Sequence, residues 1–167
     1  MSTSTLTVVA GNAAIVLNDK AQKMSGTSAG YWMMGFSDHD LSVIANEKTD
    51  DATSVPAAIN DLPEGAIFVI TGYGNYYGNY PQGDLINFLN ENGAGVGLSV
   101  AEQIAGDAGS AAGGAFNYYL VGQIGGSGYE GYSFYESVAG AFELHSTQRM
   151  VDGKEVTFYF IEKLDPH

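Results

Sequence analysis

The residues best suited to chemistry in this sequence are tyrosines that lie beside amide side chains. Four tyrosines fall within eight residues and are interleaved with asparagines: Tyr73, Asn75, Tyr76, Tyr77, Asn79 and Tyr80. A tyrosine combines a rigid apolar ring with one hydroxyl, and an amide offers both a donor and an acceptor. This set is suited to sugars, because rings stack on C–H faces while amides and carboxylates bind hydroxyls. It is also typical of protein interfaces, where tyrosine is enriched.

A second group of tyrosines lies later in the chain. It comprises Tyr118, Tyr119, Tyr129, Tyr132 and Tyr135, near Asn117 and Gln123. Alternation along residues 116–120 predicts that part of this group belongs to the core. We therefore centre the predicted ligand-binding site on the first group. Its residues are Asn75, Tyr76, Tyr77, Asn79, Tyr80, Asp84 and Asn117.

Catalytic and cofactor motifs are weak by comparison. Residues 26–30, Gly-Thr-Ser-Ala-Gly, match the letters of a nucleophile elbow around Ser28, with His39 or His145 as partner. That motif requires a strand before the serine and a helix after it, whereas here a polar loop precedes a predicted strand. In residues 72–78 the glycines are spaced differently from a dinucleotide loop, and Pro81 separates them from the next helix. A serine hydrolase is therefore the least favoured alternative, and we predict no catalytic residue and no cofactor.

Two acidic segments have ligand types that suit metals. Residues 38–40 are Asp-His-Asp, which His145 could in principle join, and residues 46–51 contain Glu47, Asp50 and Asp51, which could hold calcium. Neither segment has the spacing of a known metal motif, so solvated turns are the better interpretation. No pair of carboxylates stands out for glycoside hydrolysis among nineteen acidic residues. We predict no metal site.

Composition excludes several classes of protein. The chain has 167 residues, with 19 Asp+Glu against 6 Lys+Arg and a net charge of −13. So acidic a surface repels phosphates and anionic lipids, which argues against nucleic-acid partners. No apolar run is long enough for membrane insertion, no signal peptide is recognised, and cysteine is absent. We expect one globular domain over residues 1–167, either cytoplasmic or exported without a classical signal.

The elements that must position these residues are mostly strands. Hairpins are predicted at residues 6–10 with 14–17, at 31–36 with 41–45, and at 142–150 with 155–161 around Asp152-Gly153. Further strands are predicted at 66–71, 116–124 and 132–138, and loops at 72–80 and 125–131. Helices are predicted at 57–62, at 84–92 before Gly93, and from Ser99 to residue 105 by a capping box. The predicted class is α+β, as a compact β-rich sandwich with two or three short helices.

This order of elements carries a family resemblance. Residues 64–71 read Glu-Gly-Ala-Ile-Phe-Val-Ile-Thr, the helix 84–92 runs into Gly93-Ala94, and residues 118–125 read Tyr-Tyr-Leu-Val-Gly-Gln-Ile-Gly. Over roughly residues 6–128 the chain resembles the interleukin-like EMT inducer (ILEI) domain family. The resemblance implies a compact β-β-α sandwich without enzymatic activity. Members of the family include secreted, cytokine-like proteins.

The resemblance also implies the location of a sugar site. A related stem domain of a protein O-mannose N-acetylglucosaminyltransferase binds sugar through an Asp after the central strand and an Arg before the later aromatic strand. Those places fall near Gly74-Asn75 and Ala115-Phe116, where this sequence has neither residue. The chain also lacks the family's cysteines and has an extra C-terminal hairpin, residues 141–164. Only the location of the site is therefore implied.

These observations predict a non-catalytic, carbohydrate-binding (lectin-like) module whose partner is a glycan or glycoprotein. The alternative is a protein-interaction domain, such as a secreted signalling factor or adhesin tip, that uses the same tyrosines. Exposed strand edges could also make the chain a homo-oligomer.

Overall fold

The computed structural model describes residues 3–10, 14–18, 20–23, 30–73, 79–108, 116–126, 128–134 and 140–164. The strands are β1 Thr3–Ala10, β2 Ala14–Leu17, β3 Lys20–Ala21, β4 Gly30–Phe36, β5 Val43–Thr49, β6 Ile67–Tyr73, β7 Phe116–Gln123, β8 Gly128–Phe134, β9 Gly140–Val151 and β10 Lys154–Leu164. The helices are α1 Ala57–Asn60, α2 Gly83–Glu91 and α3 Val96–Ala108. The predicted α+β class with a majority of strands is confirmed.

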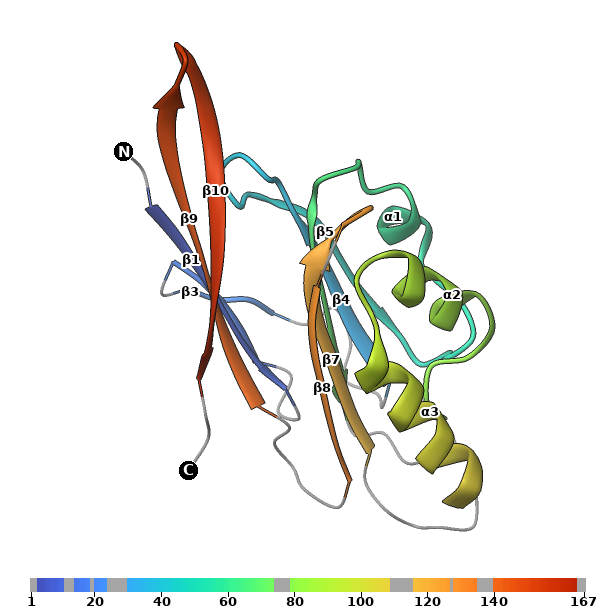
Figure 1. Ribbon diagram of the computed structural model, residues 1–167. Coiled ribbons are helices and arrows are strands. Elements are labelled where there is room, and N and C mark those ends of the chain that lie inside the picture. The colour runs from blue at the N-terminus through green and yellow to red at the C-terminus, as the bar shows by residue number, and fades with distance from the viewer. Residues whose placement is uncertain are drawn as a thin grey trace.

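Within the described residues the strands form two five-stranded sheets, and all neighbouring strands in each sheet are antiparallel. The first sheet has the order β10-β9-β1-β2-β3, and the second has the order β5-β4-β6-β7-β8. Figure 1 shows helices α1, α2 and α3 on one side of the second sheet and the first sheet on its other side. The second sheet is therefore the layer that positions the helices.

The predicted hairpins are present. β1 pairs with β2 and β4 with β5, while β9 pairs with β10 through a turn at Asp152 and Gly153. These two turn residues have φ angles of 50° and 78°, as a two-residue type I′ turn requires. Since β9 also pairs with β1 from Thr3↔Thr147 to Ala10↔Gly140, the C-terminal hairpin is an integral part of the first sheet.

Strand β6 is the centre of the second sheet and is buried on both faces, as its continuous apolar run predicts. Phe68 and Ile70 belong to the helix-side core, a cluster of buried residues shared with α1 and α2. Ile67 and Val69 belong to the sheet-side core, which also contains Leu6 of β1. Alternate residues of one strand therefore supply two cores.

Helix α2 confirms the helix predicted at residues 84–92. Leu85, Phe88, Leu89 and Asn92 are buried on one face, as their spacing predicts. Gly93 follows the helix with a φ of 111°. The Asn92 side chain donates to the Phe88 carbonyl at 2.8 Å and accepts from the Gly125 amide at 2.9 Å, which ties the helix end to the turn after β7.

Helix α3 begins earlier than the capping box at Ser99 predicts. It starts at Val96, so Ser99 lies within its first turns, and it extends to Ala108. The carboxylate of Glu130 accepts hydrogen bonds from the amides of Gly95, Gly97 and Leu98 at 2.9, 2.7 and 3.0 Å. A residue of β8 therefore satisfies the first turn of α3, a role that the prediction gave to Ser99.

Two predicted strands are shifted along the chain. β5 covers Val43–Thr49, beyond the predicted 41–45, because its pairing with β4 continues to Tyr31↔Thr49. β8 covers Gly128–Phe134, so the loop predicted at 125–131 is wrong from residue 128 onward. Of the strand predicted at 132–138, residues 132–134 are confirmed and residues 135–138 lie outside the described residues. The pairing of β8 with β7 starts at Gly122↔Gly128. In both cases pairing with the neighbouring strand includes residues that lie outside the predicted strand.

Candidate ligand-binding pocket

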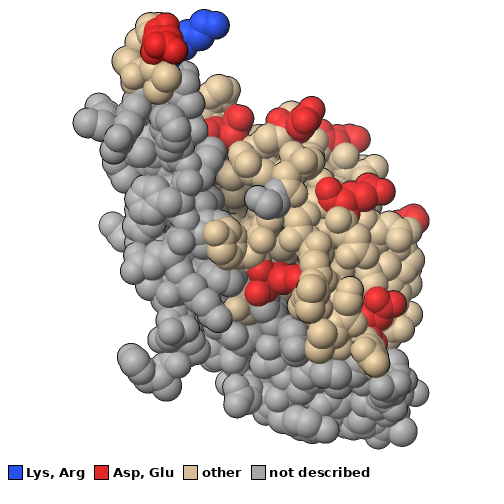
Figure 2. Space-filling view, viewed as in Figure 1, with Lys and Arg blue, Asp and Glu red and all other residues tan. Residues whose placement is uncertain are grey.

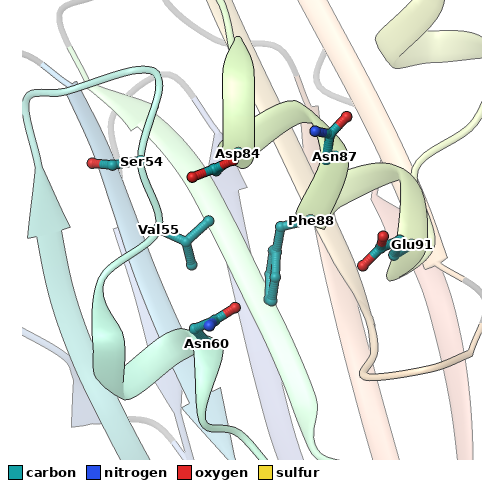
Figure 3. A pocket seen from close by; sticks show the side chains of 7 residues that line it. All are labelled: Ser54, Val55, Asn60, Asp84, Asn87, Phe88 and Glu91. Atoms are coloured by element: carbon teal, nitrogen blue, oxygen red, sulfur yellow. The ribbon is translucent and has the colours of Figure 1, made fainter.

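A surface pocket of about 300 Å³ lies between α2, α1 and the segment that precedes α1. Its walls combine hydroxyl, amide and carboxylate groups with two apolar side chains. The lining residues are Ser54, Val55, Asn60, Asp84, Asn87, Phe88 and Glu91. Figure 3 shows the last four along α2, with the first three facing them.

Helix α2 supplies one wall through a regular stripe of residues. Asp84, Asn87, Phe88 and Glu91 follow the spacing i, i+3, i+4 and i+7, which places them on one side of a helix. Phe88 also belongs to the buried face of α2, whereas Asp84, Asn87 and Glu91 are exposed. The pocket therefore follows the boundary between the buried and exposed faces of this helix.

The opposite wall is a loop held by its own side chains. Asp51 Oδ1 accepts hydrogen bonds from the Thr53 amide at 2.8 Å and from the Thr53 hydroxyl at 2.6 Å. These bonds to Thr53 lower the pKa of Asp51 below its ordinary value. The Asp51 amide in turn donates to the Thr49 hydroxyl at 3.0 Å. The end of β5 therefore leads into a fixed turn that presents Ser54 to the pocket.

Backbone hydrogen bonds join the two walls. The amide of Gln82 donates to the Ala52 carbonyl at 2.8 Å, and the amide of Asp84 donates to the Thr53 carbonyl at 3.0 Å. Between them, Gly83 has a φ of 55°, and a Cβ added there would lie 3.1 Å from the Thr53 carbonyl oxygen. Glycine therefore permits both the backbone conformation and the close approach of the loop to α2.

The floor of the pocket is apolar and firmly packed. Phe88 is only 8% exposed, and its ring contacts the Phe68 ring of β6 edge to face, with centroids 5.2 Å apart and an interplanar angle of 82°. Val55 packs against the same helix-side core and is half-buried. The accessible lining of the pocket is therefore mainly polar, and Val55 and the small exposed part of Phe88 supply its apolar surface.

The structure brings one residue of the predicted site, Asp84, into this pocket. Tyr80 is half-buried against the helix-side core, and the Asn79 carbonyl accepts a 2.6 Å hydrogen bond from the buried Tyr31 hydroxyl. Asn117 lies in β7 opposite Ser133 of β8. The remaining members of the predicted site, which are Asn75, Tyr76 and Tyr77, lie outside the described residues.

Two tyrosines of the second group are structural. Tyr118 and Tyr119 are 0% and 1% exposed, because opposite faces of β7 are covered by the two cores. The Tyr118 hydroxyl donates to Glu130 at 2.6 Å, and burial together with this bond raises the pKa of Tyr118 above its ordinary value. Tyr129 is 53% exposed. The prediction that part of this group belongs to the core is confirmed.

Sequence reasoning missed most of the pocket. Asn60 and Ser54 come from other segments than α2, and nothing in their local sequence relates them to it. The sequence does contain a pattern that relates Asn87 and Glu91 to Asp84. The three residues form a polar stripe beside the apolar face of the predicted helix.

The other candidate motifs contribute no site among the described residues. Asp40 Oδ1 accepts from the Ser42 amide at 3.0 Å within its own turn, and the Asn46 side chain is bonded to Trp32 and Lys23. The described part of the chain contains no group of three or more acidic, histidine or cysteine side chains that could hold a metal. Ser28 lies outside the described residues, and the chain after it enters β4 rather than a helix.

Among the described helices, none is long and apolar enough to cross a membrane. A scan against models of protein families and a search of curated proteins each find no match to this chain. The resemblance to the ILEI domain family therefore stays a prediction.

Proposed function

We propose that this protein is a non-catalytic, carbohydrate-binding (lectin-like) module whose ligand occupies the pocket between α1 and α2. The observation that carries the proposal is the arrangement of two amides, two carboxylates and a hydroxyl around the apolar floor formed by Phe88 and Val55. Most small-molecule sites are lined mainly by apolar side chains, whereas this pocket is lined mainly by polar ones, which suits a ligand rich in hydroxyl groups.

Each type of side chain in the pocket can contact a particular group of a sugar. The C–H groups of the ring contact Phe88 and Val55, while the amides of Asn60 and Asn87 donate to and accept from hydroxyls. The carboxylates of Asp84 and Glu91 accept hydrogen bonds from further hydroxyls. At about 300 Å³ the pocket lies at the small end of the range for ligand sites, which suits one or two sugar units.

The affinity expected of such a site is low, with dissociation constants of about micromolar to millimolar for one pocket. Strong attachment to a glycan or glycoprotein would then depend on several pockets acting together.

A glycan array followed by calorimetry on two matched variants tests this proposal. Asn87 and Asn90 are both exposed asparagines of α2, but only Asn87 lines the pocket. We expect Asn87→Ala to weaken binding of an array-selected glycan by about tenfold, the cost of one lost hydrogen-bonding group, and Asn90→Ala to leave it unchanged. Equal effects of both variants, or an array without any enriched glycan, would contradict the proposal.

We further propose that the two sheets form a sandwich of the ILEI type. In support, the sheet-side core contains Leu6 and Ile15 of the first sheet together with Trp32 and Val69 of the second. A shared core of this kind is what holds two sheets face to face.

A protein-interaction domain is the second candidate, and one observation favours it. Val43 and Ile44 are 45% and 48% exposed on β5, which lies at an edge of the second sheet. An edge strand with exposed aliphatic side chains offers both backbone groups and apolar area to another chain. Sedimentation velocity tests the simplest case, a homo-oligomer: if this edge mediates association, Ile44→Lys will abolish it and Asn87→Ala will not.

A further inference from the structure

The pocket between α1 and α2 has a pronounced charge imbalance. Asp84 and Glu91 are exposed carboxylates, and the other five lining residues are uncharged. Neither carboxylate has an ion-pair partner among the residues that the structure describes. A ligand that enters the pocket therefore meets two negative charges and no positive charge.

The two carboxylates stand at opposite ends of the pocket. They are seven residues apart on α2, which corresponds to about 10 Å along the helix axis and nearly the same side of the helix. Asn87 and Phe88 lie between them on the same stripe. If one unit of an oligosaccharide lies over Phe88, Asp84 therefore lies toward the unit on one side of it and Glu91 toward the unit on the other side.

Glu91 makes its end of the pocket the more negative one. The carbonyl end of a helix carries a partial negative charge of roughly half an electron, and a basic residue there is favourable. The last turn of α2 contains Glu91 and no basic residue, whereas Asp84 lies in the first turn, where its charge is favourable. A cation beside Glu91 would relieve an unfavourable interaction already present in the protein.

The protein surface around the pocket adds to its negative electrostatic potential. The chain has a net charge of −13, and Figure 2 shows acidic side chains distributed over the described part of one face, with basic side chains visible only at the tip of the β9–β10 hairpin. Long-range attraction of a cationic ligand and repulsion of an anionic one follow from this distribution.

We infer that the pocket selects an amino sugar whose amine is unacetylated and therefore cationic, in preference to neutral, N-acetylated or acidic sugars. This inference rests on the proposed carbohydrate function. The apolar floor contacts the ring and the amides bind its hydroxyls, while the ammonium group donates hydrogen bonds to Glu91 or Asp84. N-acetylation removes the charge and enlarges the substituent, and both changes oppose entry into a pocket of about 300 Å³.

Calorimetric titration with three tetrasaccharides tests the inference. The probes are β-1,4-linked tetramers of glucosamine, N-acetylglucosamine and glucose, at low salt and a mildly acidic pH that keeps the amine protonated. We expect the glucosamine tetramer to bind about tenfold more tightly than the other two. Raising the salt concentration should reduce this preference, because exposed charges are screened.

Three variants with the same loss of charge separate pocket binding from general attraction to an acidic surface. Asp84→Asn and Glu91→Gln alter the pocket, whereas Glu102→Gln alters an exposed acid of α3 that does not line it. We expect each pocket variant to weaken glucosamine binding by about threefold, the scale of one exposed ion pair, and the Glu102 variant to leave it unchanged.

The outcomes distinguish the two proposals. Equal binding of the three tetramers, sensitive to Asn87→Ala, would overturn the preference for amino sugars and leave the carbohydrate function intact. Glucosamine binding that all three charge variants weaken equally would overturn the preference too, because it would reflect the net charge alone. No binding of any tetramer, together with an array without an enriched glycan, would overturn both.

Discussion

The helix side and the sheet side of the second sheet are built from adjacent residues of the same strands, yet their buried polar groups have different partners. In β4, Tyr31 belongs to the helix-side core and Trp32 to the sheet-side core, and in β7 the same holds for Tyr118 and Tyr119. On the helix side both tyrosine hydroxyls donate to oxygen acceptors, the Asn79 carbonyl and the Glu130 carboxylate. On the sheet side, the Trp32 ring nitrogen donates to Asn46 at 2.7 Å.

This comparison shows how one sheet can combine two tasks. Its sheet side packs mostly aliphatic and aromatic side chains against the first sheet, with Asn46 at its margin. Its helix side carries a polar network from Tyr118 through Glu130 to the start of α3, and this side also holds the pocket beside α2. Buried polar groups that are fully paired make such a side rigid and specific.

Glu130 is the centre of the helix-side network. Its carboxylate accepts four hydrogen bonds, three from backbone amides and one from Tyr118. A Cβ on Gly97 would lie 2.8 Å from the Glu130 carboxyl carbon, so glycine at this position permits the approach of the carboxylate. The Glu130 carboxylate therefore supplies the negative charge that is favourable at the N-terminus of α3.

Alkaline pH should produce the largest effect, and it acts on both sides of the sheet. Burial raises the pKa values of Tyr31, Tyr118 and Tyr119 above those of the unfolded chain. Their contribution to stability is fully present below roughly pH 10, the unfolded value, and is lost as the pH rises above it.

Absorbance of tyrosinate and far-UV circular dichroism, recorded together against pH, test this expectation. Part of the tyrosinate signal should appear only when the dichroism is lost. Ionisation of every tyrosine while the folded signal persists would show that these rings are not enclosed as described.

Glu130→Ala should produce the next largest effect and should act on the helix side alone. The substitution leaves three amides and the Tyr118 hydroxyl without their acceptor, so we expect a loss of about 3 kcal/mol in the free energy of unfolding. Urea denaturation measures this loss, and Glu102→Ala, which removes an exposed carboxylate of α3, is the control. A similar small change in both variants would refute the role assigned to Glu130.

Asn46→Ala probes the sheet side and should have a smaller effect. Asn46 joins the Trp32 ring nitrogen to the Lys23 carbonyl, at 2.7 and 2.8 Å. Its removal leaves the ring nitrogen of a 1% exposed tryptophan without its acceptor, at a cost of about 2 kcal/mol. Unfolding followed by Trp32 fluorescence measures the loss. Glycan affinity should be unchanged, and a parallel loss of affinity would mean that the two sides are not independent.

The parts of this fold that could be predicted are those whose signal is local. The buried face of α2, the apolar run of β6 and the turn at Asp152-Gly153 each follow from residues that are close in sequence. All three predictions are confirmed. The limits of β5 and β8 depend on pairing with the neighbouring strand, and the start of α3 depends on a partner that is distant in sequence. Glu130, for instance, lies 35 residues after Gly95, which donates to it.

The site was harder to predict than the fold for the same reason. Asp84 is predicted only as a neighbour of the tyrosine-rich loop. Ser54 and Asn60 reach the pocket through the pairing of the loop at Ala52 and Thr53 with the start of α2. The tyrosine pattern indicated aromatic residues without distinguishing exposed from structural ones. Tyr31 and Tyr118 have hydroxyl partners inside the protein, which composition alone does not reveal.

A two-dimensional amide NMR titration of the labelled protein with a glycan selected on an array tests most directly whether the pocket binds carbohydrate. If the glycan occupies the pocket between α1 and α2, the largest shift changes will map to Asn60, Asn87 and Phe88. Changes centred on Val43 and Ile44 of β5, or no localised change at saturating glycan, would contradict this prediction.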